Sequence, residues 1–217
     1  MTHVVTALVW LAVGAVVGVG IRWGSVWLAR REELKPAFRR RDVLGPPVLT
    51  ALLFGGLGWL VGPHAELLVR SLWVALLVQI IFFDFEHGLI LDVVQLPAIV
   101  AAILLSPFTT GAGLVNSLIT AVGFAVVFVI LAAVGSAIFK AEALGFGDVK
   151  LAALLGAMLG WPWGGTALIL GVLLAGVAGL VLLLFRVRGL RQGLAYGPYL
   201  ATGALIVLFE ISASGAQ

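Results

Sequence analysis

Two acidic clusters interrupt an otherwise apolar chain. Gly145-Phe146-Gly147-Asp148 places a carboxylate at the start of one apolar segment, and Asp84-Phe85-Glu86 closes another. Charges at membrane depth are costly and usually serve a function. Two carboxylates in a poorly hydrated site tend to share one proton, so that one activates water while the other polarises a carbonyl group. We therefore predict that Asp84 and Asp148 form an acid/base pair suited to hydrolysis of a peptide bond.

Each acid also has a purely structural interpretation. Asp148 could cap a helix that starts at Val149, a common role for aspartate. Asp84 and Glu86 could be interfacial acids that end a span in water. Asp92 falls inside the next apolar segment, about two helical turns beyond Asp84, so it could support the acid pair or be a buried, hydrogen-bonded group.

The composition indicates a membrane protein. Of the 217 residues, 62% are hydrophobic and 11% are charged, whereas a soluble domain has about 25% charged residues. The mean hydropathy is +1.20. The chain has no cysteine, which excludes disulfides and thiolate metal sites. The three histidines show no metal-ligand spacing, and we expect neither a metal nor a cofactor.

Apolar runs of about 20 residues predict about eight transmembrane helices, and hence an all-α, polytopic membrane helix bundle. At this length a single domain, residues 1–217, is expected. The sixth span is short, and residues 22–45 form a short basic loop. The predicted spans are residues 4–21, 46–62, 66–84, 88–106, 114–139, 149–162, 164–185 and 195–213.

The basic residues predict the orientation. In this topology every Lys and Arg except Arg70 falls on one face, which the positive-inside rule makes cytoplasmic. Asp84 and Asp148 then lie at the same depth on that face, and Arg70 extends to the outer interface. The basic pI indicates orientation and contact with membrane lipids. We expect no nucleic acid partner, because the basic run 39–41 lacks interleaved aromatic residues.

Three motifs resemble those of the type IV prepilin peptidases, membrane aspartic proteases with a Gly-x-Gly-Asp motif. Residues 84–92, followed by Leu96-Pro97, are similar to the first acidic motif of that family. Residues 145–151 resemble the second motif, and residues 196–201 resemble a Gly-Pro-aromatic-Leu-Ala segment near the family's C-terminus. The order, spacing and topology agree over residues 45–210.

The resemblance implies an aspartic endopeptidase that cleaves the basic leader from type IV prepilins or pseudopilins, in pilus assembly or protein secretion. The site would face the cytoplasm in a multi-pass protein of the cell membrane. Asp84 and Asp148 match the catalytic aspartates. Gly145 and Gly147, lacking a Cβ, would let an extended substrate backbone approach closely. The supporting or substrate-binding positions are Gly145, Gly147, Glu86, Asp92 and Lys150.

Two departures from the family pattern stand out. Leu91 replaces the usual proline before Asp92. Bifunctional members carry a larger cytoplasmic loop whose paired cysteines bind zinc, and they N-methylate the new terminus with S-adenosylmethionine. Here the loop is short and has no cysteine, so the resemblance is to a short form, and we expect cleavage without methylation.

Two alternatives remain open. A small ion- or proton-coupled transporter could use Asp84, Asp92 and Asp148 as a relay. Against it, the sequence shows no inverted repeat, and the acids gather at one face. The chain could also be an inactive, structural member of the peptidase family.

Overall fold

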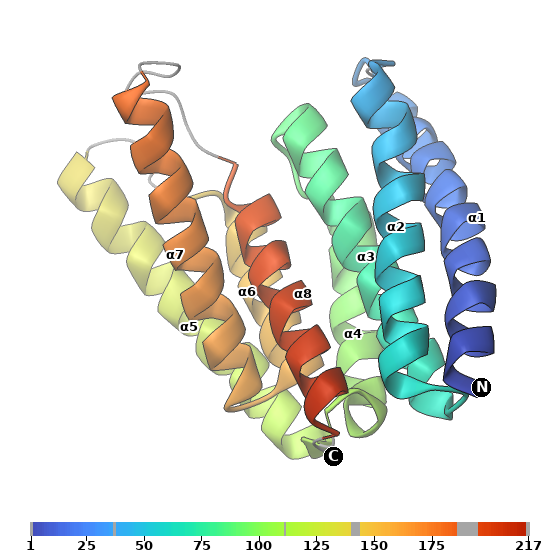
Figure 1. Ribbon diagram of the computed structural model, residues 1–217. Helices are drawn as coiled ribbons and strands as arrows, with labels where there is room; N and C mark the ends of the chain where they lie inside the picture. The colour runs from blue at the N-terminus through green and yellow to red at the C-terminus, as the bar shows by residue number, and fades with distance from the viewer. Residues whose placement is uncertain (1, 37, 111, 140–143, 186–194, 216–217) are drawn as a thin grey trace. The chain divides into compact units, whose positions relative to one another are not determined.

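The computed structural model describes residues 2–36, 38–110, 112–139, 144–185 and 195–215 (Figure 1). Within these ranges the chain forms eight α-helices and no strand, which confirms the predicted all-α class. The helices are α1 (Thr2–Arg31), α2 (Arg40–Val61), α3 (Ala65–His87), α4 (Asp92–Thr109), α5 (Gly113–Phe139), α6 (Phe146–Leu159), α7 (Trp163–Leu184) and α8 (Gly197–Ser214).

Seven of the described helices are long and apolar enough to cross a membrane. The exception is α6, which has 14 residues and is therefore about 21 Å long. The hydrocarbon core of a bilayer is about 30 Å thick. The expectation of about eight spans therefore becomes seven candidate spans and one shorter helix.

Several helix ends differ from the predicted spans. Helix α1 continues to Arg31 and α2 begins at Arg40, so the segment between them is residues 32–39, shorter than the predicted loop of residues 22–45. Arg22, which the prediction placed in the loop, lies within α1 and forms a buried ion pair with Glu86. Helix α4 begins at Asp92, so the prediction that Asp92 lies inside a span is wrong.

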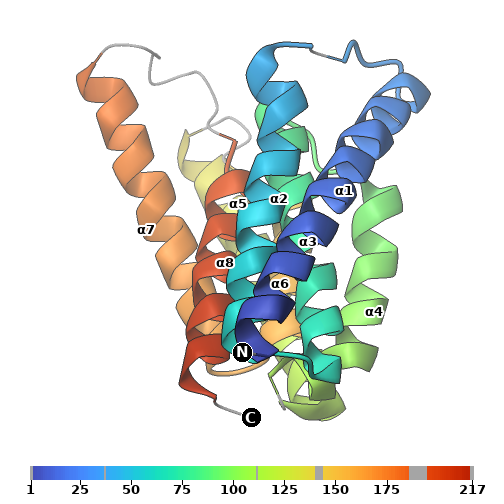
Figure 2. The same cartoon turned by 45° about the vertical axis from the view of Figure 1, so that its right-hand side comes forward.

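The chain divides into two compact units, the first formed by residues 1–88 and 208–217. In this unit α1, α2 and α3 pack against one another (Figures 1 and 2). Small residues allow α1 and α2 to approach closely. A Cβ on Gly14 would lie 2.6 Å from the carbonyl oxygen of Thr50, and one on Gly18 would overlap the backbone of Pro47. Gly14 and Gly18 thus form a Gly-x-x-x-Gly contact of the kind that joins membrane helices.

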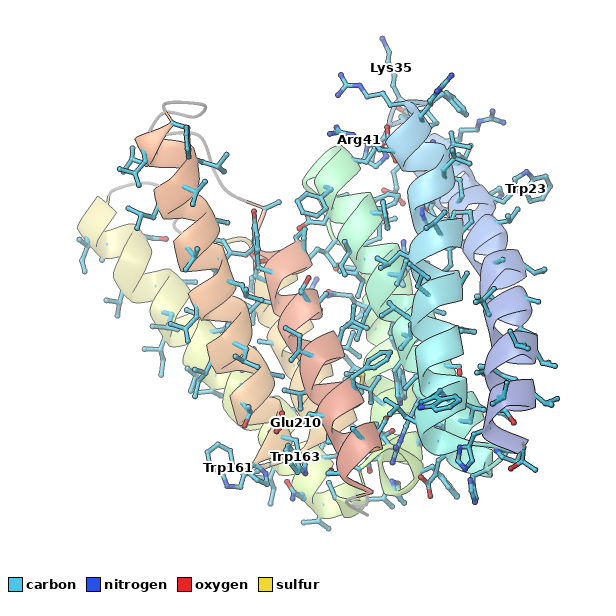
Figure 3. All side chains as sticks on the ribbon, viewed as in Figure 1. Trp23, Lys35, Arg41, Trp161, Trp163 and Glu210 are labelled. Atoms are coloured by element: carbon cyan, nitrogen blue, oxygen red, sulfur yellow. The ribbon has the colours of Figure 1, made fainter. Side chains whose placement is uncertain are left out.

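Arg70 lies in the interior of the first unit. It is 4% exposed, and its guanidinium donates hydrogen bonds to Glu66 and Ser212, each at 3.1 Å. The prediction that Arg70 extends to the interface is therefore wrong, because α8 supplies a polar partner for it. Figure 3 shows Glu210, from the same end of α8, far from Lys35 and Arg41 within this unit.

The second unit, residues 89–207, is organised around the short helix α6. This helix contacts α4, α5 and α7, and most of its side chains from Val149 to Leu159 are buried. A Cβ on Gly156 would lie 2.8 Å from the carbonyl oxygen of Thr120, so glycine allows α5 and α6 to touch. Thr110 donates to the carbonyl of Leu159 at 3.1 Å. Figure 3 shows Trp161 and Trp163 together just after α6.

Candidate active site

Asp84 lies in the last turn of α3, in the first unit. The helix ends at His87 because Gly88 adopts the left-handed conformation (φ 64°). The Gly88 N–H donates to the Asp84 carbonyl at 2.8 Å. Asp84 is 5% exposed, and the Glu86 side chain is also 5% exposed. The interpretation of these residues as acids that end a span in water is therefore wrong.

Glu86 forms a buried ion pair. Arg22 of α1 donates from Nη1 to Glu86 Oε2 at 2.7 Å, and the Arg22 side chain is 10% exposed. His87 Nε2 lies 3.5 Å from the other carboxylate oxygen of Glu86. The ring of Phe38 lies 5.5 Å from the Arg22 guanidinium, within cation–π distance. Sequence reasoning singled out Glu86 without Arg22, although an arginine within a long apolar helix signals a buried partner.

Asp148 lies in the first turn of α6, in the second unit. The helix begins at Phe146 with Gly145 as its N-cap, so the interpretation of Asp148 as the cap of a helix starting at Val149 is wrong. The Asp148 N–H donates to the Gly145 carbonyl at 3.0 Å. Backbone N–H groups at a helix start carry a partial positive charge, which favours an ionised carboxylate there.

The two glycines of this motif lie close to other groups of the second unit. A Cβ on Gly147 would lie 3.2 Å from the Cβ of Ile90, and one on Gly145 would lie 3.4 Å from Asp148 Oδ2. Gly147 therefore allows α6 to pack closely against the segment that precedes α4. Access of a substrate backbone to these glycines stays a prediction.

Lys150 pairs with Asp92 and joins the starts of two helices. Its Nζ donates to Asp92 Oδ1 at 2.5 Å. The Lys150 side chain is 21% exposed and that of Asp92 59%. The Phe146 ring lies 5.2 Å from Nζ, one turn earlier on the same helix. Sequence reasoning named both residues of this pair but not their contact.

Two of the four acids in the motifs form ion pairs with basic residues. Glu86 and Asp92 neutralise Arg22 and Lys150, so their charges are engaged in holding helices together. The convergence of Asp84 and Asp148 stays a prediction, since the two residues belong to different units. Among the described residues no three of His, Asp and Glu could hold a metal ion, and the chain has no cysteine.

The third motif forms the start of α8. Gly197 opens the helix, and Pro198 follows in its first turn, where its missing N–H costs no hydrogen bond. Leu200 and Ala201 are buried. A Cβ on Gly171 would lie 2.7 Å from the Leu200 Cα, so this motif packs α8 against α7. The basic residues Lys140, Arg186, Arg188 and Arg191, which helped to predict the orientation, lie outside the described residues.

Comparison with known proteins identifies the family. Residues 71–184 match the model of the type IV leader peptidase family. This segment contains Asp84, Glu86, Asp92, Asp148 and Lys150. The chain belongs to the type IV leader peptidase family. Arg22 and the third motif lie outside the matched segment of this family member.

The similar curated proteins carry the name prepilin leader peptidase/N-methyltransferase. The Aeromonas hydrophila protein is 30% identical over 74% of this chain and 56% of its own length. The Pseudomonas aeruginosa protein is 32% identical over 73% of this chain and 55% of its own. The Pseudomonas putida protein is 31% identical over 88% of this chain and 68% of its own length. The chain thus spans little more than half the length of most of these relatives. No solved structure matches it.

Proposed function

We propose that this leader peptidase family member is an aspartic endopeptidase that removes the basic leader of type IV prepilins or pseudopilins. One observation carries the proposal: the matched segment contains both acidic motifs, and in each motif the residue two positions after the aspartate forms an ion pair. Glu86 after Asp84 pairs with Arg22, and Lys150 after Asp148 pairs with Asp92. Such pairs hold the helix ends that carry the acids, as precise catalysis requires.

The proposed chemistry needs only these two acids and one water molecule. The ionised aspartate takes a proton from water, whose oxygen attacks the peptide carbonyl carbon. The protonated aspartate donates to the carbonyl oxygen. When the tetrahedral intermediate breaks down, the C–N bond cleaves and the leaving nitrogen takes the proton that the first aspartate removed from water. The second aspartate regains a proton from a hydroxyl group of the intermediate. The position of Asp148 at a helix start supports its ionised form as the base.

We place this reaction at the cytoplasmic face of the cell membrane. In the first unit, the described basic residues around the α1–α2 connection lie at one end, where Figure 3 shows Lys35 and Arg41. Exposed Trp23 and Trp27 flank this end on α1, and tryptophan favours membrane interfaces. Basic and aromatic residues together favour contact with anionic lipids of the cytoplasmic leaflet. The leader of a prepilin would reach the site from this side.

The contacts of Asp92 argue against the alternative of an ion or proton relay. A relay needs acids along the depth of the membrane. Asp92 lies at the first residue of α4, is more than half exposed, and is neutralised by Lys150. It is therefore better suited to holding α4 and α6 together than to carrying a proton through the bundle.

The test of the proposal is cleavage of a prepilin by the purified protein in detergent or liposomes. Asp84→Asn and Asp148→Asn should each abolish cleavage, because an amide neither takes a proton from water nor shares one. The loss should be about 10⁴-fold or more, as for removal of other activated-nucleophile machinery. Thermal unfolding of each variant checks that it is folded.

Glu210→Gln is the matched control. Glu210 is an exposed acid of the same chain near the end of α8, and its variant should cleave at the wild-type rate. Full activity in a folded Asp84→Asn or Asp148→Asn variant would exclude the two-aspartate mechanism. Absence of cleavage by the wild-type protein with every prepilin of its host would leave the inactive-member alternative as the better account.

A further inference from the structure

Arg22 is a buried cation outside the matched family segment. It lies in α1, and only 8% of the residue is exposed. Its hydrogen bond to Glu86 measures 2.7 Å and joins residues 64 positions apart in the sequence. A charge-assisted hydrogen bond between desolvated groups is stronger than one in water. Removal of one partner is costly because it leaves a buried, uncompensated charge.

An aromatic ring lies beside each member of this ion pair. Phe38, just before α2, lies over the Arg22 guanidinium at 5.5 Å. His87 Nε2 lies 3.5 Å from Glu86 Oε1, and the His87 ring packs against Phe83 with centroids 4.7 Å apart. Few other conformations are therefore open to the Glu86 side chain.

The backbone that carries Arg22 is itself firmly placed. Gly18 lies one helical turn before Arg22, against Pro46 and Pro47 of α2. Gly14 lies one turn earlier, against Thr50 and Phe54. Because neither glycine has a Cβ, α1 and α2 touch along their backbones. Arg22 thus connects the last turn of α3 to a closely packed pair of helices.

We propose that Arg22 is a positioning residue for Asp84. It holds the last turn of α3 through Glu86, and Asp84 belongs to that turn. The inference rests on the proposed peptidase function. A displacement of about 1 Å at a reacting group can lower a rate about 100-fold. Loosening of this turn should therefore lower kcat and change KM little.

The experiment measures kcat and KM for prepilin cleavage by Arg22→Gln, Glu86→Gln and the double variant. We expect kcat to fall about 10- to 100-fold in each single variant, with KM within about twofold of the wild type. The double variant should be no worse than the poorer single variant, because both changes remove the same interaction. Arg22→Lys keeps the charge and should recover part of the loss. Activity is expressed per folded molecule, so that a loss of stability alone leaves kcat unchanged.

Arg30→Gln is the matched control, because Arg30 is an exposed arginine of the same helix; its kcat should equal that of the wild type. A wild-type kcat in folded Arg22→Gln would overturn the inference. If Arg22→Gln does not fold, the Glu86→Gln variant provides the test, because glutamine keeps the shape of the side chain and removes only its charge. A wild-type kcat in Glu86→Gln would also overturn the inference. If Asp84→Asn is inactive while Arg22→Gln is fully active, the peptidase proposal stands and only the inference about Arg22 fails. If Asp84→Asn is active, the peptidase proposal itself fails.

Discussion

Lys150 Nζ lies 2.5 Å from Asp92 Oδ1, so the helix that carries Asp148 is tied near its start to the first residue of α4. The contact lies within the second unit and needs both acidic motifs, since Asp92 belongs to the first and Lys150 to the second. The two motifs are therefore connected by structure as well as by order in the sequence. Gly147 against Ile90 adds an apolar contact at the same junction.

Removal of the Lys150–Asp92 ion pair should lower kcat/KM clearly and the free energy of unfolding only slightly. Lys150→Met and Asp92→Asn should each reduce kcat/KM about 10-fold or more, because the start of α6 loses a fixed position. The free energy of unfolding should change by less than about 1 kcal/mol, because the pair is partly exposed and its charges are screened. Prepilin cleavage and thermal unfolding of the same preparations measure the two effects.

Lys35→Met is the control for this pair, since Lys35 is an exposed lysine in the α1–α2 connection. It should match the wild type in both assays. An unchanged kcat/KM in Lys150→Met would show that the pair does not position α6 for catalysis.

The close contact between α1 and α2 predicts a difference between two glycines two residues apart. Gly18→Ala should destabilise the protein by about 1–3 kcal/mol, because the new methyl group would overlap the backbone of α2. Gly20→Ala should be neutral or stabilising by up to about 1 kcal/mol, since nothing lies within 4 Å of its Cβ position and alanine favours helix. Thermal unfolding in one detergent compares them. Equal stability of the two variants would contradict the Gly-x-x-x-Gly contact.

The sequence predicted the centres of the helices better than the partners of their charged residues. Hydropathy depends on the local chain, so each predicted span overlaps an observed helix. Arg22 pairs with a residue 64 positions away and Arg70 with one 142 positions away, and a local window contains neither partner. For that reason the sequence predicts too early an end for α1 and predicts that Arg70 extends to the interface. The sixth span is predicted to be short, at residues 149–162, and α6 is indeed short, although it begins at Phe146 and ends at Leu159.

The predicted orientation can be tested with single cysteines, because the chain has none. Arg30→Cys should react with an impermeant thiol reagent only after the cells are permeabilised. His64→Cys and Phe108→Cys, at exposed positions that the predicted topology puts outside the cell, should react in intact cells. The positive-inside rule gives this direction. Labelling of Arg30→Cys in intact cells would invert the topology and place the site outside.

The last prediction concerns methylation, the second activity in the names of the relatives. A methyl donor with a nucleoside and a charged sulfonium needs a polar pocket, and the described connection between α1 and α2 is residues 32–36 and 38–39. This segment offers exposed charges and one aromatic residue, Phe38, which already covers Arg22. We therefore expect mass spectrometry of the cleaved prepilin, after incubation with S-adenosylmethionine, to show a free, unmethylated N-terminus.

The control for this experiment is a bifunctional relative, such as the Pseudomonas aeruginosa protein named above, incubated with the same substrate and donor. It should yield a product heavier by one methyl group and so show that the substrate can be methylated. If this chain alone gave the methylated product, residues outside the α1–α2 connection would have to bind the donor.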